Sequence, residues 1–124
     1  MHQSLIRVLI VDDHEILRLG LAIFLEARDD LELVGQAANG QEAVELCAQL
    51  QPDVVVMDIA MPVMDGLTAT AIITDQYPGI GVVILTSSLG GEGEPAARRV
   101  GASSYLRKTV TADEIASAIH AAVA

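Results

Sequence analysis

The chain has 124 residues, of which 52% are apolar and 19% charged, a composition typical of one globular domain with a sizeable core. No stretch reaches the roughly 18 uncharged apolar residues of a membrane helix, and the first residues lack the basic-then-apolar pattern of a secretory signal. Seven basic against seventeen acidic residues give a formal charge of −10, which argues against nucleic-acid binding by this domain itself. We therefore expect a cytoplasmic domain that contacts neither membrane nor DNA directly.

Cysteine and histidine usage excludes two further classes of site. The single cysteine, Cys47, cannot form an internal disulfide, and its setting in EAVELCAQL predicts a small apolar residue on a helix. The three histidines, His2, His14 and His120, are far apart in the sequence and show no ligand spacing. A zinc or haem centre is therefore not expected.

The first predicted element is the apolar run LIRVLIV at 5–11, which ends directly at Asp12 and Asp13. A run that is apolar at nearly every position predicts a strand covered on both faces. Adjacent carboxylates repel each other, and burying either one beside a core is costly unless a cation or hydrogen-bond donors compensate. We therefore expect a positive group at the end of this strand.

The next segment, 14–27, is predicted to be an amphipathic helix. Its apolar residues recur near a 3.6-residue period. The stripe expected to face the core consists of Ile16, Leu17, Leu21, Phe24 and Leu25.

Further strands and helices alternate along the rest of the chain. Apolar runs rich in β-branched residues predict strands at 31–37, 53–58, 81–87 and, more weakly, 103–108. Strands separated by helical patterns are typical of βαβ units in a parallel sheet. We find no internal repeat or linker, so the whole chain predicts one α/β, doubly wound (βα)5 domain of the flavodoxin-like type, with parallel strands in the order 2-1-3-4-5.

The later helices carry their own start and stop signals. Two of them open with capping-box pairs, Asn39 with Glu42 and Thr111 with Glu114. The first of these is bounded by Pro52, and the second is expected to run to about Ala122. Another helix is predicted over 66–77, closed by a Pro-Gly pair.

The weakest helical pattern lies between the fourth and fifth strands. SSLGGEGEP at 87–95 contains three glycines and a proline, and each interior glycine costs about 1 kcal/mol relative to alanine, a proline about 3 kcal/mol. Pro95 is tolerated in a first turn. We therefore expect a mobile loop at 88–94 and a short fourth helix of two turns or fewer, from about Glu94 to Val100.

Carboxylates are predicted to gather at one edge of the sheet. In open parallel sheets, ligands bind beyond the carboxyl ends of the strands, where the strand order reverses. In the expected order this point lies between the first and third strands, which end at Asp12, Asp13 and Asp58. Three carboxylates from two neighbouring strands predict a site for a hard cation with oxygen ligands, which we expect to be magnesium.

Two more polar residues, Thr86 and Lys108, end the fourth and fifth strands at the same edge. An ammonium, a metal ion and a hydroxyl can share the charge of a phosphoryl group, so this constellation predicts phosphoryl chemistry. Each residue alone has an ordinary structural explanation. Five of them on one sheet edge are hard to explain by chance.

Over its full length the chain resembles a response-regulator receiver domain of a two-component system, in the stretches VLIVDDHEILRLGL, ANGQEAVEL, PDVVVMDIAMPVMDG, ILTSS and GASSYLRK. VDDHEILRLGL, together with a lysine that no proline follows, resembles the NarL/FixJ class. Members of this class usually carry a carboxyl-terminal helix-turn-helix that binds DNA. The resemblance implies that residues 1–124 are the receiver domain, and we expect them to be the N-terminal part of a longer transcription regulator whose output domain is not present here.

The resemblance also implies roles for the acidic residues. Asp58 would be the phosphoacceptor, which takes a phosphoryl group from the phosphohistidine of a sensor histidine kinase. Asp13 would bind Mg2+ directly and Asp12 mainly through water, while Asp58 and the backbone carbonyl of Ala60 would complete the protein's ligands. No enzymatic activity is implied beyond self-phosphotransfer and autodephosphorylation.

The remaining residues would carry the signal. Lys108 and Thr86 would contact the phosphoryl group, and Tyr105 would be a switch aromatic that moves inward when Thr86 moves. Phosphorylation is expected to promote self-association, as a homodimer, or to release an output surface through this face. One departure concerns Thr109, which replaces the proline that many receivers place after the lysine in a cis bond; a cis bond here would cost about 2.5–4 kcal/mol, which leaves the isomer open.

Two alternatives stay open at the level of sequence. A haloacid-dehalogenase-type aspartyl-phosphate hydrolase also joins an aspartate nucleophile, magnesium and a lysine. Its nucleophile lies in a DxDx[TV] pattern after the first strand, which DDHEI lacks, and a chain of this size leaves no room for a substrate cap. The other alternative is a receiver-like module that never takes phosphate and acts only by protein contact; it would incorporate no label from a small phosphodonor.

Overall fold

The computed structural model describes residues 5–87 and 93–123, in which strands and helices alternate. The strands are β1 Ile6–Val11, β2 Leu31–Ala37, β3 Val54–Met57, β4 Gly81–Thr86 and β5 Ser104–Arg107. The helices are α1 Glu15–Glu26, α2 Gly40–Leu50, α3 Gly66–Gln76, α4 Gly93–Arg99 and α5 Ala112–Val123. In this described part of the chain, no helix has the length and apolar run that a bilayer span needs.

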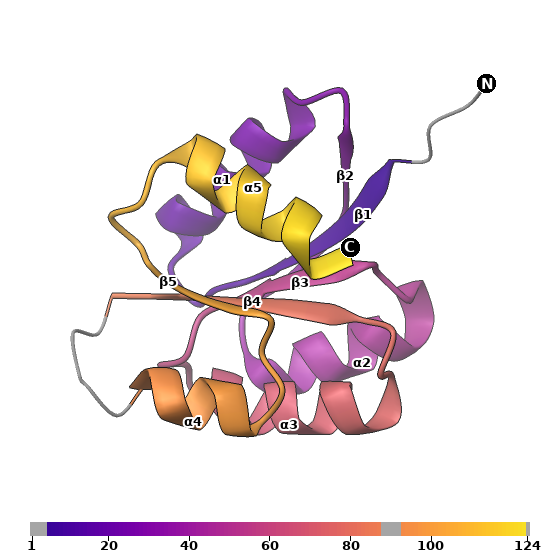
Figure 1. Cartoon of the computed structure of the whole chain (residues 1–124), viewed down its shortest axis with the longest axis vertical. Helices are drawn as coiled ribbons and strands as arrows, with labels where there is room; N and C mark the ends of the chain where they lie inside the picture. Colours follow the sequence, from indigo (N-terminus) through magenta and orange to yellow (C-terminus); the bar gives the residue numbers. More distant parts are fainter. Residues whose placement is uncertain (1–4, 88–92, 124) are drawn as a thin grey trace.

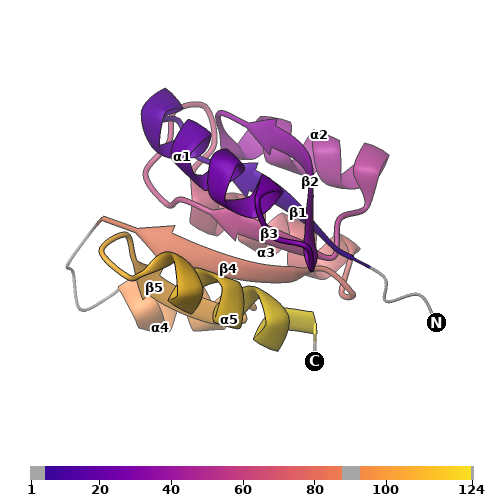
Figure 2. The same cartoon turned by 90° about the horizontal axis from the view of Figure 1, so that it is seen from above.

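All five strands form one parallel sheet in the order β2-β1-β3-β4-β5, which confirms the predicted topology. Helices α1 and α5 cover one face, and α2, α3 and α4 cover the other (Figure 1). Figure 2 looks onto the first face, with α1 beside β1 and β2 and α5 beside β4. The carboxyl ends of the strands therefore lie together, at the left of Figure 1 where β4 ends.

Two apolar layers, one on each face of the sheet, form the core. Alternate residues of β1 and β3 point to opposite layers, as the two-residue period of a strand requires. Val8, Ile10, Val54 and Val56 pack toward the α1 and α5 side, and their neighbours in the strands pack toward α2, α3 and α4. The strands are apolar at nearly every position because both of their faces are buried.

The predicted inward stripe of α1 is wrong at its amino-terminal end. Ile16 is 84% exposed and Leu17 45%, whereas Leu25 is fully buried and Leu21 and Phe24 are half-buried. Ile16 and Leu25 are nine residues apart, which is about 2.5 helical turns and places them on opposite faces. The sheet contacts the face that carries Leu25, so Ile16 points to solvent.

The predicted helix starts of α2 and α5 are confirmed by capping hydrogen bonds. The Asn39 side chain accepts from the backbone N–H of Glu42 at 2.9 Å, and the Thr111 hydroxyl accepts from that of Glu114 at 3.1 Å. Helix α2 ends one residue before a left-handed Gln51, directly ahead of Pro52. Cys47 is fully buried on α2, as its apolar setting predicted.

Helix α4 has seven residues and therefore two turns, as predicted, but it begins at Gly93 rather than Glu94. Pro95 lies in its first turn, where its missing N–H costs no intrahelical hydrogen bond. The loop predicted at 88–94 falls mostly on residues 88–92, which lie outside the described part of the chain.

Candidate functional site

Two buried carboxylates meet where the strand order reverses. Asp12 directly follows β1 and Asp58 directly follows β3, and the backbone N–H of Asp58 donates to the carbonyl of Val11 at 2.9 Å. Asp12 is 2% exposed and Asp58 4%. Neighbouring parallel strands thus deliver two negative charges to one poorly hydrated spot.

The positive group expected at this edge is the ammonium of Lys108. Its Nζ atom lies 2.9 Å from Asp12 Oδ2 and 3.2 Å from Asp58 Oδ2, and its side chain is 12% exposed. The backbone N–H of Lys108 donates to the Thr86 carbonyl at 2.8 Å, which ties the residue to the end of β4. The bond between Lys108 and Thr109 is trans, since no cis bond occurs among the described residues.

Electrostatics at the site follow from this arrangement. Burial raises the pKa of the Asp58 carboxyl, the charge of Asp12 raises it further, and Lys108 opposes both. Burial acts to lower the pKa of Lys108, but the ion pairs with Asp12 and Asp58 outweigh it, so that pKa is raised. Lys108 is therefore a firmly charged ammonium beside a carboxylate that is costly to ionise.

Asp13 and His14 extend the cluster toward solvent. The Nδ1 atom of His14 lies 3.1 Å from Asp12 Oδ1 and 3.3 Å from Asp13 Oδ1. Asp12, Asp13, His14 and Asp58 each offer one ligand atom, and these atoms all lie within 4.8 Å of one another. Three of the four donors are carboxylate oxygens, the ligands that Mg2+ prefers, so the donor set fits a magnesium ion held by Asp12, Asp13 and Asp58.

The loop between β3 and α3 folds back onto Asp58. The Asp58 Oδ1 atom accepts from the N–H of Ile59 at 2.8 Å, and the N–H of Gly66 donates to the Ile59 carbonyl at 2.8 Å. A side chain at position 66 would collide with the backbone oxygen of Asp58, so this close approach requires glycine. Ala60, whose carbonyl was expected to complete the metal ligands, is exposed in this loop.

Thr86 and Tyr105 lie on the adjoining strands. Thr86 is 2% exposed at the end of β4. Tyr105 pairs with Ile84 of β4, its ring packs against the core, and its buried hydroxyl faces Gly93 at the start of α4. Tyr105 therefore links β5 to the start of α4.

Two residues at the site were not anticipated from the sequence. The sequence does not indicate His14 as a site residue through histidine spacing, because the three histidines lie far apart; its signal is its adjacency to the acidic pair. Arg18 donates from Nη1 to the Asp12 backbone carbonyl at 2.6 Å, and its signal is a place one helical turn beyond His14. Both hold the turn that carries Asp12 and Asp13.

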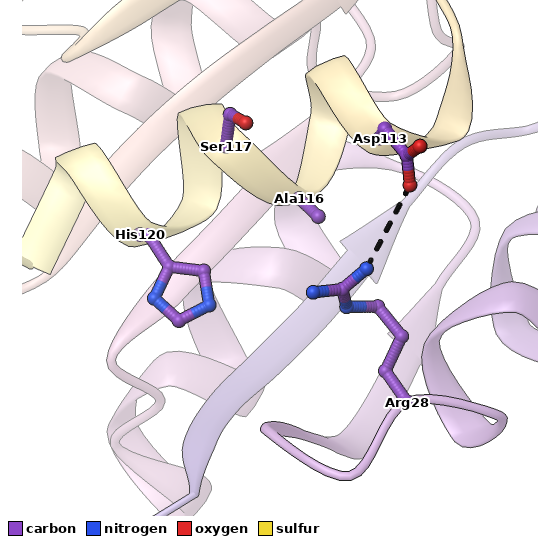
Figure 3. A pocket seen from close by; sticks show the side chains of 5 residues that line it. All are labelled: Arg28, Asp113, Ala116, Ser117 and His120. Atoms are coloured by element: carbon purple, nitrogen blue, oxygen red, sulfur yellow. Dashed lines mark ion pairs between the residues drawn. The ribbon is translucent and has the colours of Figure 1, made fainter.

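A separate pocket of about 430 Å³ lies at the other end of the sheet, between α5 and the turn before β2 (Figure 3). Its lining residues are Arg28, Asp113, Ala116, Ser117 and His120. Arg28 pairs with Asp30 at 2.9 Å, and His120 lies 2.6 Å from the same carboxylate. Arg28 and then His120 hold the pKa of Asp30 well below its usual range. These charges compensate one another and link α5 to the sheet, away from Asp58.

Comparison with known proteins agrees with the fold. The model of the response regulator receiver domain matches residues 8–120. The chain therefore belongs to the family of response-regulator receiver domains, the signalling modules of two-component systems. The family match leaves the haloacid-dehalogenase alternative without support.

Several relatives are transcriptional regulators. The chain is 47% identical over 118 residues to the transcriptional regulatory protein LiaR of Bacillus subtilis, covering 95% of this chain and 56% of LiaR. It is 41% identical over 114 residues to the response regulator VraR of Staphylococcus epidermidis, covering 92% of this chain and 54% of VraR. The chain thus spans about half the length of these relatives.

Solved structures of the NarL and LuxR type share the fold. The signal receiver domain of the response regulator NarL from Mycobacterium tuberculosis superposes with a TM-score of 0.91 at 30% identity, covering 95% of each chain. A LuxR-family regulator from Aurantimonas sp. SI85-9A1 gives a TM-score of 0.90 at 34% identity, covering 97% of this chain and 86% of that one. These neighbours agree with the NarL/FixJ resemblance of the sequence.

Proposed function

We propose that this domain is the phosphoacceptor of a two-component response regulator and that Asp58 takes the phosphoryl group. The observation that carries the proposal is the pair of buried carboxylates, Asp12 and Asp58, with Lys108 between them at 2.9 and 3.2 Å. Lysine beside buried acids at the end of parallel strands suits the transfer of a phosphoryl group, in which positioning and charge neutralisation do most of the work.

In the transfer, a carboxylate oxygen of Asp58 forms a new P–O bond as the P–N bond of the phosphohistidine of a sensor kinase breaks. The freed imidazole keeps the electron pair of that bond, and the product is an acyl phosphate. The ammonium of Lys108, already charged and close to Asp58, is placed to pair with the phosphoryl oxygens. The Thr86 hydroxyl would contact the same group.

We infer that Asp12, Asp13 and Asp58, with the carbonyl of Ala60, hold Mg2+ during the transfer. The bound ion would neutralise the charge of the phosphoryl oxygens. Asp13 is the most exposed of the three carboxylates, which supports its assignment as the direct ligand, with Asp12 acting mainly through water. Affinity without phosphate should be weak, because Mg2+ gives up its waters reluctantly.

We propose that phosphorylation is transmitted to the output by movement of Thr86 and Tyr105 toward the phosphoryl group. The matched part of this chain covers 56% of LiaR and 54% of VraR. We propose that residues 1–124 are likewise the N-terminal receiver of a cytoplasmic transcription regulator, which reaches DNA through a helix-turn-helix in a further domain. The receiver itself would act as a signalling domain, with self-phosphotransfer and autodephosphorylation as its only chemistry.

Phosphorylation is tested first by intact mass. Incubation with acetyl phosphate and Mg2+ should add one phosphoryl group to the wild-type chain and none to Asp58→Asn. Asp75→Asn is the matched control, because Asp75 is exposed in the last turn of α3, away from the carboxyl ends of the strands. This variant should be modified like the wild type. Equal modification of Asp58→Asn would refute the assignment, and an unmodified wild type would favour a receiver that acts only by protein contact.

A second consequence of phosphorylation at Asp58 concerns the association of two copies of the chain. Phosphorylation is expected to promote a homodimer, or to release an output surface, through the β4 and β5 face, because Thr86 and Tyr105 lie on these strands. Sedimentation velocity with and without acetyl phosphate measures it, with Asp58→Asn as the control. An unchanged sedimentation coefficient in a fully phosphorylated sample would remove dimerisation from the proposal.

A further inference from the structure

The His14 imidazole lies directly against two carboxylates of the acidic site. Its Nδ1 atom lies 3.1 Å from Asp12 Oδ1 and 3.3 Å from Asp13 Oδ1. The His14 side chain is 59% exposed, so the ring can rotate without disturbing the core. A nitrogen ligand is therefore available beside the oxygens proposed to hold Mg2+.

The backbone around His14 is held in place, so only the ring has to move. The N–H of His14 donates to Asp12 Oδ1 at 2.8 Å, and its carbonyl accepts from the N–H of Arg18 at 2.9 Å. Arg18 also donates to the Asp12 carbonyl. These contacts hold the His14 backbone at one distance from the acidic pair, and a preorganised ligand loses little entropy on binding.

The donor atoms are close enough to share one ion. The ligand atoms of Asp12, Asp13, His14 and Asp58 lie within 4.8 Å of one another. Two ligands at about 2.1 Å from one ion are at most about 4.2 Å apart, so a small closure brings all four within reach of it. Carboxylates alone favour Mg2+, whereas imidazole favours ions such as Ni2+ and Zn2+.

We propose that His14 supplies a nitrogen ligand to this site, so that the domain binds Ni2+, a cation that imidazole favours, as well as Mg2+. The inference rests on the metal site of the proposed function and deepens it. Selectivity for Ni2+ over Mg2+ is then a property of His14, whereas binding of Mg2+ depends on the carboxylates.

A competing explanation gives His14 a purely orienting role. In that case the ring only hydrogen-bonds Asp12 and Asp13 and sets their direction. Its loss would then change the affinities for Ni2+ and Mg2+ by the same factor, since both ions use the carboxylates. The two explanations therefore differ in the ratio of affinities.

The test measures Ni2+ and Mg2+ binding by titration calorimetry in a reference chain that keeps His14 and in its His14→Gln and His14→Phe variants. The chain has three histidines, so the reference chain and both variants carry His2→Gln and His120→Gln to remove the other imidazoles. Loss of His14 should weaken Ni2+ binding by about tenfold or more, the range known for metal-site partners, and change Mg2+ binding by less than about threefold. Pulsed electron paramagnetic resonance of bound Mn2+ should show nitrogen-14 coupling that both variants lose.

The possible results distinguish failure of the His14 ligand role from failure of the proposed magnesium site. Equal weakening of Ni2+ and Mg2+, or Mn2+ that shows no nitrogen coupling in the reference chain, would overturn the ligand role of His14 and leave the magnesium site standing. A reference chain that binds none of these ions at millimolar concentration would overturn the metal site itself, and the inference with it.

Discussion

At the residue scale, the site places more negative charge in a buried spot than its one lysine neutralises. Asp12 and Asp58 are almost fully buried, and Lys108 pairs with both. One carboxylate charge is left for a cation or a phosphoryl-metal complex to compensate. Such uncompensated charge is costly to the folded state and is typical of functional sites, where activity is favoured over stability.

Replacement of Asp58 by asparagine should therefore stabilise the metal-free domain. Burial raises the pKa of Asp58, so the folded state bears the cost of ionising it at neutral pH. We expect Asp58→Asn to raise the free energy of unfolding by about 1 kcal/mol, measured by urea unfolding in EDTA. The exposed control Asp75→Asn should stay within about 0.5 kcal/mol of the wild type.

The pH dependence of this effect has a defined sign. A carboxyl whose pKa is raised on folding favours the folded state below its unfolded pKa of about 3.9 and loses that contribution as pH rises through its folded pKa. The advantage of Asp58→Asn should thus be small in acid and grow toward neutral pH. An advantage that shrinks as pH rises would contradict this account of Asp58.

The sequence predicted the positions of the five strand-end residues correctly, but it did not indicate the neighbouring residues that contact them. Strand-end positions predicted that Asp12, Asp13, Asp58, Thr86 and Lys108 would gather at one edge, and the structure places all five there. His14 and Arg18 were missed because their contacts depend on the turn between β1 and α1. Turn geometry has no repeating period in the sequence, so only adjacency could have indicated them.

At the element scale, sequence patterns predicted the length of α4 but not which face of α1 meets the sheet. The 3.6-residue period identified α1, but the exposed residues Ile16, Leu19 and Ile23 form an apolar stripe of their own. With apolar residues on two faces, periodicity alone cannot tell which face meets the sheet. For α4, glycine and proline costs predicted a helix of two turns correctly, because they place its start close to Pro95.

The start of α4 is predicted to be coupled to Tyr105. A methyl group at position 93 would collide with the Tyr105 hydroxyl, so Gly93→Ala should destabilise the domain by about 1–3 kcal/mol, the usual cost of overpacking. Gly20→Ala is the control: Gly20 lies in α1 with no heavy atom within 4 Å of the added carbon. That variant should gain about 1 kcal/mol from helix propensity.

A double-mutant cycle with Tyr105→Phe separates contact from propensity. If the collision with the hydroxyl is the cause, Gly93→Ala should cost less in the phenylalanine background, as interacting neighbours do. Urea unfolding followed by circular dichroism gives all four free energies. The same cost in both backgrounds would show that the cost does not arise from contact with the Tyr105 hydroxyl.

At the scale of the whole molecule, the fold followed from the order of elements. Buried strands that alternate with helices leave few topologies, because parallel crossovers are right-handed and short. The predicted order was therefore correct throughout, and the strand ends agreed to within a residue or two. Identity of the phosphoryl donor and of the regulated output depends on contacts with other molecules, which neither topology nor patterning encodes.

The proposed function depends most directly on which carboxylate takes the phosphoryl group. Borohydride reduces an acyl phosphate to an alcohol, so a phosphorylated aspartate becomes homoserine, which peptide mass spectrometry locates. After treatment with acetyl phosphate and Mg2+ and then borohydride, we expect homoserine at position 58 and aspartate at positions 12 and 13. Homoserine at position 12 or 13, or none in a chain that has gained the mass of a phosphoryl group, would contradict the assignment of Asp58.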